Sequence, residues 1–349
     1  MKNIFVRISL SIILIIISIN GCKKDGTDPI LPLVDDRIPF ELNFLEYSDN
    51  SYFIDSVYTD TNSALNMFNR YYGSTVPVIL LEYLVQNIEV YISANTIVPN
   101  NIQTVIADAY LNLPPRSPSE LYPDSFRGHS NVIPGYTETT RFKLLSPGAD
   151  YIFHSETGYI TFLFPVPEDR AIAVAYRVSN PNPVGEDIFY GEFFSELIEN
   201  SKTSAVLKLI KPRNLLPQYS GAWQLKMKNI YKITSQYEQI ADLDFDIYLK
   251  RADGSESNTI NNIRLLELFG FDKIKSDGTI GPDGIFDGRK GINYEPKTAE
   301  IIFPVIQPFG YNIPALLESY QHQAIYDTMK VLLSVPGNTF VIKGKYRPI

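Results

Sequence analysis

Cysteine is almost absent from this chain, and its absence limits how the fold can be stabilised. Cys22 is the only cysteine among 349 residues, so an internal disulfide cannot form. Stability must therefore come from the burial of apolar side chains, which a chain of this length can supply. Histidine and tryptophan are also scarce, with three residues and one residue respectively.

The usual sequence signatures of catalysis are missing as well. The chain contains no G-x-S-x-G, H-E-x-x-H or Walker A motif. His129, His154 and His322 are far apart, and their spacing is not that of a metal site. We therefore expect a protein that is not an enzyme, although two carboxylates that are distant in the sequence can still form a catalytic pair.

Long apolar runs and basic clusters are lacking after the first 21 residues. No later segment reaches the roughly 20 apolar residues that a membrane-spanning helix needs. The formal net charge of the whole chain is −8. An acidic chain without basic clusters is a poor candidate for binding nucleic acid or anionic lipid head groups. We expect no nucleic acid among its partners.

The N-terminal segment has the order of a signal peptide. Lys2 and Arg7 precede an apolar run over residues 8–19, and Cys22 follows Asn20 and Gly21 directly. A charged start, an apolar middle and a small residue at the end are typical of a segment that is removed after export.

The end of this segment resembles the lipobox of bacterial lipoproteins. The resemblance implies that residues 1–21 are removed and that Cys22 carries an N-terminal acyl lipid. Residues 22–36 then form a tether, which is polar at first and shows no periodicity. The alternatives are an ordinary secretory signal and an N-terminal membrane helix, for which the apolar run is too short.

Composition and turn signals favour an α+β fold, built mostly of antiparallel β-sheet with a few short helices. The chain contains 23 Tyr and 20 Phe, which favour sheets, and its 24 Pro and 20 Gly are spread along the sequence. Residues 151–164 have two apolar runs around a Ser-Glu-Thr-Gly turn, which predicts a hairpin. Residues 292–304 follow the same plan. Further strands are predicted at residues 88–92, 171–178 and 339–346.

Residues 37–349 are expected to form one soluble module, with a sub-boundary near residues 114–140, where turn residues are dense. Apolar and charged residues alternate over residues 223–232 and again over 242–250. If these two strands pair, the lysines of one meet the aspartates of the other, which predicts a solvated sheet face.

Two helices are also predicted. A short one, capped by Asp60 or Thr61, would carry Phe68 and Tyr72. Another would start at Pro314 and continue to about residue 332.

One acidic stretch is a candidate calcium site. Asp277, Asp283 and Asp287 lie in a glycine-rich segment, and calcium prefers several oxygen ligands from such turns. The EF-hand pattern is not met, because Thr279 and Gly281 stand where ligands would be expected. The alternative is an ordinary turn-rich loop, since Asp-Gly pairs are common in turns.

The order of segments resembles part of the SprA (Sov) family, the outer-membrane translocon proteins of type IX secretion and gliding motility in Bacteroidetes-type bacteria. The most specific matches are residues 282–310, with Pro-Asp-Gly-Ile-Phe-Asp and Pro-Phe-Gly, and residues 223–231. The matching segments, in the family's order, are residues 87–92, 150–160, 171–176, 185–186, 207–211, 223–231, 282–287, 301–310, 325–328 and 340–346.

The resemblance covers about residues 50–349, whereas family members are several times longer and close a very large barrel. It therefore implies one module of such a protein, with no transmembrane barrel of its own. The implied function is a non-enzymatic outer-membrane lipoprotein, a structural or accessory component that works with secretion or motility proteins. It would lie on the periplasmic face or at the cell surface. The alternative is a cell-surface lipoprotein that binds glycan or protein.

The predicted lipid on Cys22 leads to the first testable prediction. Cys22→Ser should move the protein from the membrane fraction to the soluble fraction without unfolding it, because the acyl group is expected to be its only anchor. Fractionation of cells, with limited proteolysis as the check on folding, measures this. A Cys22→Ser variant that stayed in membranes as an integral protein would contradict the prediction.

Overall fold

The computed structural model describes residues 35–60, 66–94, 103–128, 132–180, 182, 184–234 and 239–349. Cys22, the tether up to residue 34 and His129 lie outside the described residues. From Arg37 to Ile349 the chain forms one compact unit. Among the described residues, no helix has both the length and the apolar character that crossing a membrane requires.

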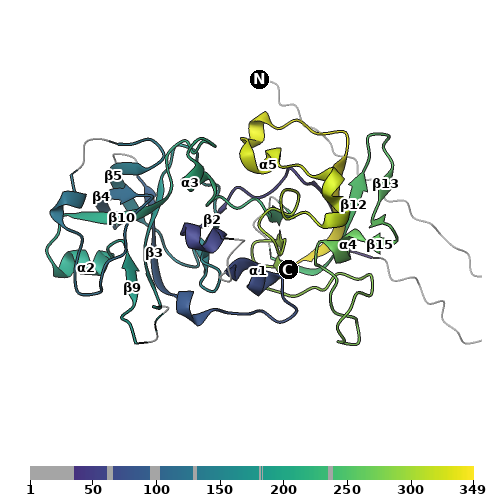
Figure 1. Ribbon diagram of the computed structural model, residues 1–349, viewed down its shortest axis with the longest axis horizontal. Helices are drawn as coiled ribbons and strands as arrows, with labels where there is room; N and C mark the ends of the chain where they lie inside the picture. The colour runs from purple at the N-terminus through teal and green to yellow at the C-terminus, as the bar shows by residue number, and fades with distance from the viewer. Residues whose placement is uncertain are drawn as a thin grey trace, which may run out of the picture. The chain divides into compact units, whose positions relative to one another are not determined.

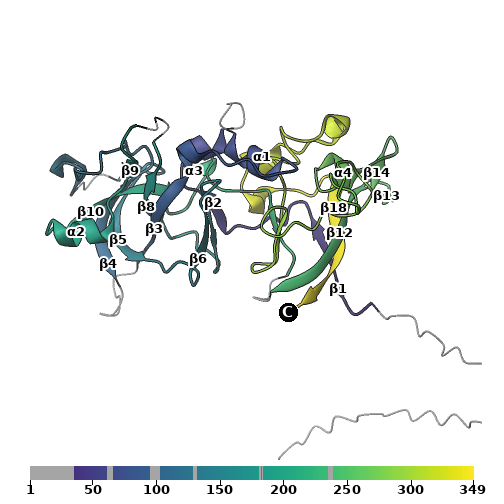
Figure 2. The ribbon, with the colours of Figure 1, turned by 90° about the horizontal axis from the view of Figure 1, so that it is seen from below.

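The largest sheet has six strands and is mostly antiparallel (Figures 1 and 2). In spatial order the strands are β10 (Ser204–Lys211), β4 (Thr104–Tyr110), β5 (Thr137–Leu144), β3 (Val85–Ser93), β8 (Ile172–Val178) and β9 (Ile188–Tyr190). Strand β10 pairs in parallel with β4 and also antiparallel with β8. Five of the six strands therefore close into a ring.

Small side chains allow this ring to close. Alternate residues of all five strands meet in one buried cluster, and many of them are alanines, among them Ala107, Ala173 and Ala205. A ring of few strands has a narrow interior that side chains must fill. Phe193 and Leu197, at the start of and within helix α2 (Phe194–Glu199), join the same cluster.

The closed ring corrects one part of the predicted fold class. The expectation of mostly antiparallel sheet with a few short helices is confirmed. The sequence analysis considered only a transmembrane barrel and predicted none. The structure contains a small closed barrel of five strands, which was not predicted. The parallel β4–β10 pair that closes this barrel joins residues about a hundred positions apart. A local sequence pattern does not predict such a distant contact.

The remaining strands form four smaller sheets. A four-stranded sheet has the order β1 (Ile38–Asn43), β18 (Thr339–Pro348), β12 (Ile240–Lys250) and β13 (Glu256–Ser257). The three-stranded sheets are β2 (Ser51–Phe53), β7 (Tyr159–Phe162) and β6 (Tyr151–His154), and β11 (Ile230–Lys232), β17 (Glu300–Ile302) and β16 (Tyr294–Glu295). Strands β14 (Thr259–Ile260) and β15 (Ile263–Arg264) form a pair.

Both predicted hairpins are confirmed, and they resemble each other in detail. Strands β6 and β7 pair antiparallel, as do β16 and β17. Gly158 turns the first hairpin at a φ of 63°, and Ala299 occupies the aligned position of the second at 54°. Thr157 and Thr298, which precede them, are both buried. A positive φ is costly for alanine, so the second hairpin keeps its turn geometry by packing.

The predicted pairing of residues 223–232 with 242–250 is wrong. Strand β11 pairs with β17, whereas β12 pairs with β18 and β13. The aspartates of β12 do face lysines, but these belong to the last strand: Asp244 lies opposite Lys345 and Asp246 opposite Lys343. The alternation of residues 242–250 does mark a strand with a charged face. The predicted solvated sheet face is wrong for residues 223–232, because only Ile230–Lys232 form a strand there and Lys228 is buried.

The helices are short. The α-helices are α1 (Met67–Tyr72), α2, α3 (Ser220–Trp223), α4 (Leu265–Leu268) and α5 (Ala324–Asp327). The 3-10 helices are η1 (Ser56–Thr59), η2 (Leu81–Tyr83), η3 (Asp124–Phe126), η4 (Ala315–Tyr320) and η5 (Lys330–Leu332). Helix α1 is capped by Asn66, not by Asp60 or Thr61 as predicted.

The long helix expected after Pro314 is also wrong, because η4, α5 and η5 replace it. Tertiary contacts explain the breaks. The backbone N–H of His322, between η4 and α5, donates to the carbonyl of Phe309. The Tyr326 hydroxyl accepts from the N–H of Phe309. These bonds hold the segment against the preceding loop, and Leu317 and Ile325 still reach the core.

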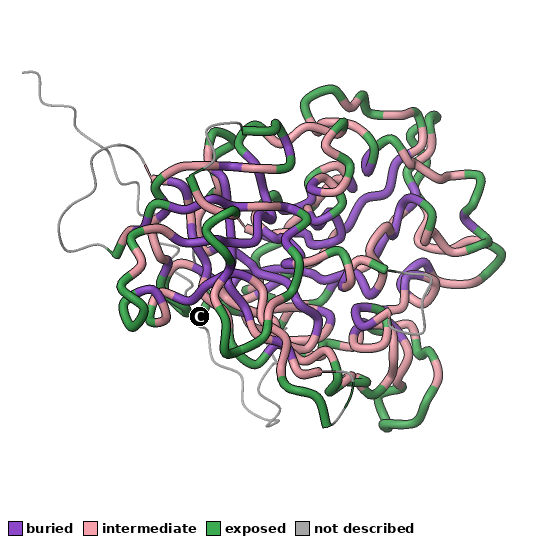
Figure 3. The backbone as a smooth tube through the Cα atoms, turned by 60° about the vertical axis from the view of Figure 1, so that its left-hand side comes forward, coloured by how far each residue is buried: buried purple, intermediate pink, exposed green. Residues whose placement is uncertain are grey.

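Two large apolar clusters stabilise the unit. One is centred on β2, β7 and α1, with Phe53, Phe68 and Tyr159 in mutual contact. The other lies under β12 and β18 and is rich in phenylalanine, including Phe303 and Phe309. Figure 3 shows buried backbone running through the interior and exposed loops around it. The aromatic content that predicted sheets is thus used largely as core.

The predicted sub-boundary at residues 114–140 falls mainly between the end of β4 at Tyr110 and the start of β5 at Thr137. These two strands pair with each other, so the segment between them is a loop within one sheet. Buried Glu192 anchors it. One carboxylate oxygen accepts from the N–H of Tyr122 at 2.9 Å and from the Arg127 guanidinium at 2.5 Å. The other accepts from the N–H of Val206 in β10 at 2.8 Å.

This anchor leads to a stability prediction. Glu192→Ala should lower the free energy of unfolding by about 3 kcal/mol, because it leaves a buried guanidinium and two buried N–H groups without their acceptor. Asp187→Ala is the matched control, since Asp187 pairs with Arg177 at 3.6 Å in a half-exposed position and should cost less than about 1 kcal/mol. Urea denaturation measures both, and equal losses would contradict the assignment.

Candidate functional site

Two adjoining cavities form the best candidate for a functional site. They have volumes of about 440 and 430 Å³, and Trp223 and Lys226 line both of them. We call the pair the Trp223 cleft. The first cavity is lined by Trp223, Gln224, Lys226 and Lys228 and, across from them, by Gln307, Tyr311, Asn312, Gln323, Tyr326 and Asp327. The second is lined by Asp49, Glu168, Lys211, Trp223, Lys226 and Lys330, together with the largely apolar side chains of Tyr52, Val166, Leu215, Met329 and Val331.

The first wall follows from the alternation of residues 223–228. Helix α3 ends at Trp223, a turn follows over Gln224 and Leu225, and the chain then continues to β11. Leu225 and Met227 enter the core, so Gln224, Lys226 and Lys228 face the cavity. The sequence predicted this alternation correctly, but it placed Trp223 on the apolar face. Trp223 is half-buried instead, and its ring forms part of the cleft.

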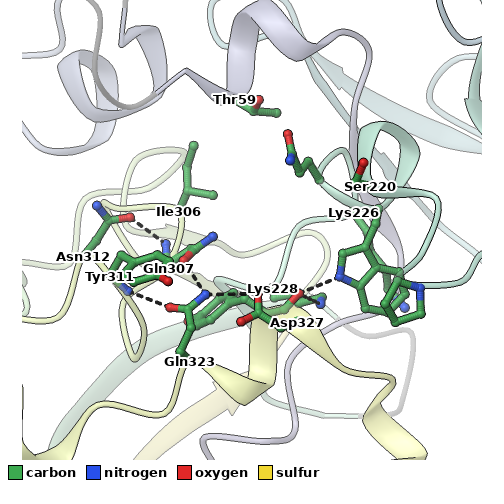
Figure 4. A pocket seen from close by; sticks show the side chains of 14 residues that line it. Thr59, Ser220, Lys226, Lys228, Ile306, Gln307, Tyr311, Asn312, Gln323 and Asp327 are labelled. Carbon is green, nitrogen blue, oxygen red and sulfur yellow. Dashed lines mark hydrogen bonds between the residues drawn. The ribbon is translucent and has the colours of Figure 1, made fainter.

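The second wall is made of amide side chains that position one another (Figure 4). The Gln323 Nε2 donates to Gln307 Oε1 at 3.2 Å and to Asp327 Oδ1 at 3.3 Å. Its Oε1 accepts from the N–H of Tyr311 at 3.1 Å. The Oδ1 of Asn312 accepts from the N–H of Gln307 at 3.1 Å. This wall is therefore fixed before any ligand arrives, which favours binding.

Several polar groups in the cleft are available to a ligand. Within the part of the chain that the structure describes, the Nε2 of Gln307 and the Nδ2 of Asn312 have no hydrogen-bond partner, nor does the amide of Gln224. Gln224 is exposed, and Gln307 and Asn312 are half-buried. Amides both donate and accept, as peptide groups and sugar hydroxyls do.

Lys228 forms the floor beside Trp223. It is only 3% exposed, and its Nζ donates to the carbonyls of Ile325 and Tyr326 at 3.1 and 2.9 Å. The same Nζ lies 4.0 Å from the centre of the Trp223 ring, a cation–π contact. Burial, with Lys226 nearby, lowers the pKa of Lys228 to about 7, because desolvation disfavours the charged form.

The second cavity has a different charge pattern. Asp49 accepts from Lys226 at 2.6 Å and from Lys330 at 3.3 Å. Buried Lys211 donates to four backbone carbonyls, those of Pro167, Glu168, Arg170 and Pro212, at 2.6 to 3.5 Å. Burial, again with Lys226 nearby, lowers the pKa of Lys211 to about 8.

The cleft is lined by polar and charged groups of several kinds. Asp327 lines the first cavity, and two carboxylates line the second, namely Asp49, which is paired with two lysines, and Glu168. Beside these three carboxylates, the lining presents amides, ammonium groups and aromatic rings, which together suit a polar ligand.

The predicted calcium residues lie elsewhere, in a loop after α4. Each carboxylate binds donors of its own segment: Asp277 accepts from Thr279, Asp283 from Ser276 and Ile285, and Asp287 from the N–H groups of Lys273 and Ile274. No three His, Cys, Asp or Glu side chains gather as a metal site within the described ranges. Calcium binding stays a hypothesis, for which a rise in melting temperature with added calcium is the measurement.

The two described histidines pack against aromatic rings outside the cleft. His154, at the end of β6, is stacked on Tyr159 with the ring centres 4.0 Å apart, and burial lowers its pKa to about 3. His322 packs against Phe44. The Trp223 cleft was not predicted from the sequence. Its one local signal was the single tryptophan, followed by polar residues at every second position.

Comparison with known proteins adds no relative: neither a scan of protein-family models nor a search of curated proteins returns a match for this chain. The resemblance to SprA thus stays a prediction from the sequence.

The position of Lys228 leads to a prediction about pH. In the folded protein the ammonium loses its proton near pH 7, whereas in the unfolded chain it does so near 10.5. Between these values the unfolded state binds more protons, so stability should rise with pH, at most by about 1.4 kcal/mol per pH unit for this one group. Below pH 7 the full cost of burying the charge is present.

Urea denaturation between about pH 7 and 9 tests this. Lys228→Met should remove that part of the rise, so the difference in stability between wild type and variant should change with pH. Lys275→Met, at an exposed position, should follow the wild type in parallel. Parallel curves for wild type and Lys228→Met would show that Lys228 does not titrate in this window.

Proposed function

We propose that this protein is a non-enzymatic outer-membrane lipoprotein that serves as an accessory component of a secretion or gliding apparatus. In this proposal it holds a segment of a partner protein in the Trp223 cleft. The observation that carries the proposal is the cleft itself: two adjoining cavities with a tryptophan between them and accessible amide groups on both walls.

The second support is where the resembling segments meet. Three of the segments that resemble the SprA family are residues 223–231, 301–310 and 325–328. They supply Trp223 and Lys228, then Gln307, and then Tyr326 and Asp327 to the first cavity. Segments that are distant in the sequence would build one shared surface, as expected if the resemblance concerns a binding role.

The third support is the predicted N-terminal lipid at Cys22. A lipid anchor keeps the cleft near the membrane, where a secretion or motility apparatus works. The tether after the cysteine gives the unit reach, since an extended chain spans up to about 3.3 Å per residue.

A second candidate function is the binding of a glycan at the cell surface. Tyr311, on the amide wall, is 77% exposed, and Trp223 opposite is half-buried. Exposed aromatic rings beside amide groups also suit sugar rings, which present apolar faces and hydroxyl edges. The experiment must therefore separate a protein partner from a polysaccharide.

In-cell photo-crosslinking does this. A p-benzoylphenylalanine in place of Tyr311 should form a covalent adduct with a protein of the secretion or motility apparatus, identified by mass spectrometry. Val184, 91% exposed and outside the cleft linings, is the control position and should give no such adduct. Trp223→Ala in the Tyr311-labelled protein should abolish it, because the indole forms the wall between the cavities.

The other outcomes are distinct. Adducts that glycosidase digestion removes would favour the glycan function. Equal adducts from positions 311 and 184, or none from either, would contradict a binding role for the cleft.

A further inference from the structure

The charge of the Trp223 cleft is opposite to that of the chain. The whole sequence carries a formal net charge of −8. The two cavities are lined by four lysines and three acids, namely Lys211, Lys226, Lys228 and Lys330 with Asp49, Glu168 and Asp327. A local excess of positive charge in an acidic protein attracts a ligand of negative charge.

The lysines are also incompletely neutralised. Within the described residues, no carboxylate oxygen lies within 4.0 Å of the Nζ of Lys211 or of Lys228, and their hydrogen bonds end on backbone carbonyls. Only Lys226 and Lys330 have an acidic partner, and they share the single carboxylate of Asp49. The cleft therefore holds two buried lysines without an acidic partner, and below about pH 7 both carry mainly a positive charge.

The mutual positions of these groups point to where a negative charge would be stabilised. Lys226 lines both cavities. Its positive charge adds to the effect of burial in lowering the pKa of Lys211 on one side and of Lys228 on the other. A carboxylate beside Lys226 would relieve this repulsion and receive charge-assisted hydrogen bonds. The Lys228 ammonium has three donors and uses two of them on carbonyls.

We propose that the Trp223 cleft selects extended polypeptide segments that carry an acidic side chain, and that this carboxylate lies beside Trp223 within reach of Lys226 and Lys228. The inference rests on the proposed function, because it names the ligand class of the same cleft. The amides of Gln224, Gln307 and Asn312 then bind peptide groups of the segment, and the second cavity receives its continuation.

Two features favour a carboxylate over a phosphate group. No arginine stands among the side chains that line either cavity in the described structure, and arginine is the residue whose planar fork matches phosphate best. The cations are also embedded among carbonyl groups, so the site offers a few directed donors and no broad basic surface. An acidic side chain, with one charge, matches it.

The test is selection from a random linear peptide library displayed on phage, with the folded mature protein as bait. Peptides retained by the wild type should be enriched in Asp and Glu relative to the input library. Lys226→Met and Lys228→Met should lose this enrichment, and Lys275→Met, outside the cleft, should keep it. Lys226 is half-buried, so Lys226→Met keeps the test valid if the more buried Lys228→Met is unstable.

A retained peptide is then synthesised with its acidic residue intact or replaced by the matching amide. Trp223 is the only tryptophan, so its fluorescence reports binding at the cleft directly. The acidic peptide should bind about tenfold more tightly than the amide peptide, the effect of one charge-assisted hydrogen bond. In Lys228→Met the two should bind alike.

The experiments distinguish a failure of the acidic selectivity from a failure of the peptide-binding function. Retained peptides without acidic enrichment, or a tenfold difference that survives in both lysine variants, would overturn the acidic selectivity and leave the peptide-binding function standing. A wild-type bait that retains no peptide, while an acidic polysaccharide such as polygalacturonate quenches Trp223, would overturn both in favour of the glycan candidate.

Discussion

Three hydrogen bonds that end on one turn of backbone hold the two walls of the cleft together. The Lys228 ammonium donates to the carbonyls of Ile325 and Tyr326, and the Trp223 Nε1 donates to the second of these. These bonds join residues about a hundred positions apart. Helix α5 has only four residues and gains its position from them, and its last residue, Asp327, in turn orients Gln323. The floor, the tryptophan and the amide wall are thus one connected structure.

The burial of the Lys228 ammonium in this network is electrostatically unfavourable. An ammonium buried against carbonyls is less stable than one in water, and the lowered pKa of Lys228 expresses that cost. An apolar side chain could fill the same space without it. Residues that are less favourable for stability than their alternatives are often found where a protein binds or acts, and Lys211 repeats the pattern in the second cavity.

Local features of the fold could be predicted from the sequence, and distant contacts could not. The hairpin at Gly158 was predictable because its strands and turn lie within about a dozen residues, and the same holds for its counterpart at Ala299. The β4–β10 pair that closes the ring joins distant segments. The helix expected after Pro314 failed because contacts with Phe309 override a correct apolar stripe. The cleft was missed for the same reason, since its lining residues are spread from Asp49 to Val331.

The pairing of the first described strand with the last one has a mechanical meaning. Strand β1 begins at Ile38, two positions after the end of the predicted tether at residue 36, and six of its residues pair with β18 on one side only. Under the lipid-anchor proposal, any tension between the membrane and a partner held in the cleft enters the unit through β1. Those six pairs bear the load before the phenylalanine core beneath them does. Because an internal disulfide cannot form, the pairing of this one edge strand then limits the force that the tethered protein withstands before it unfolds.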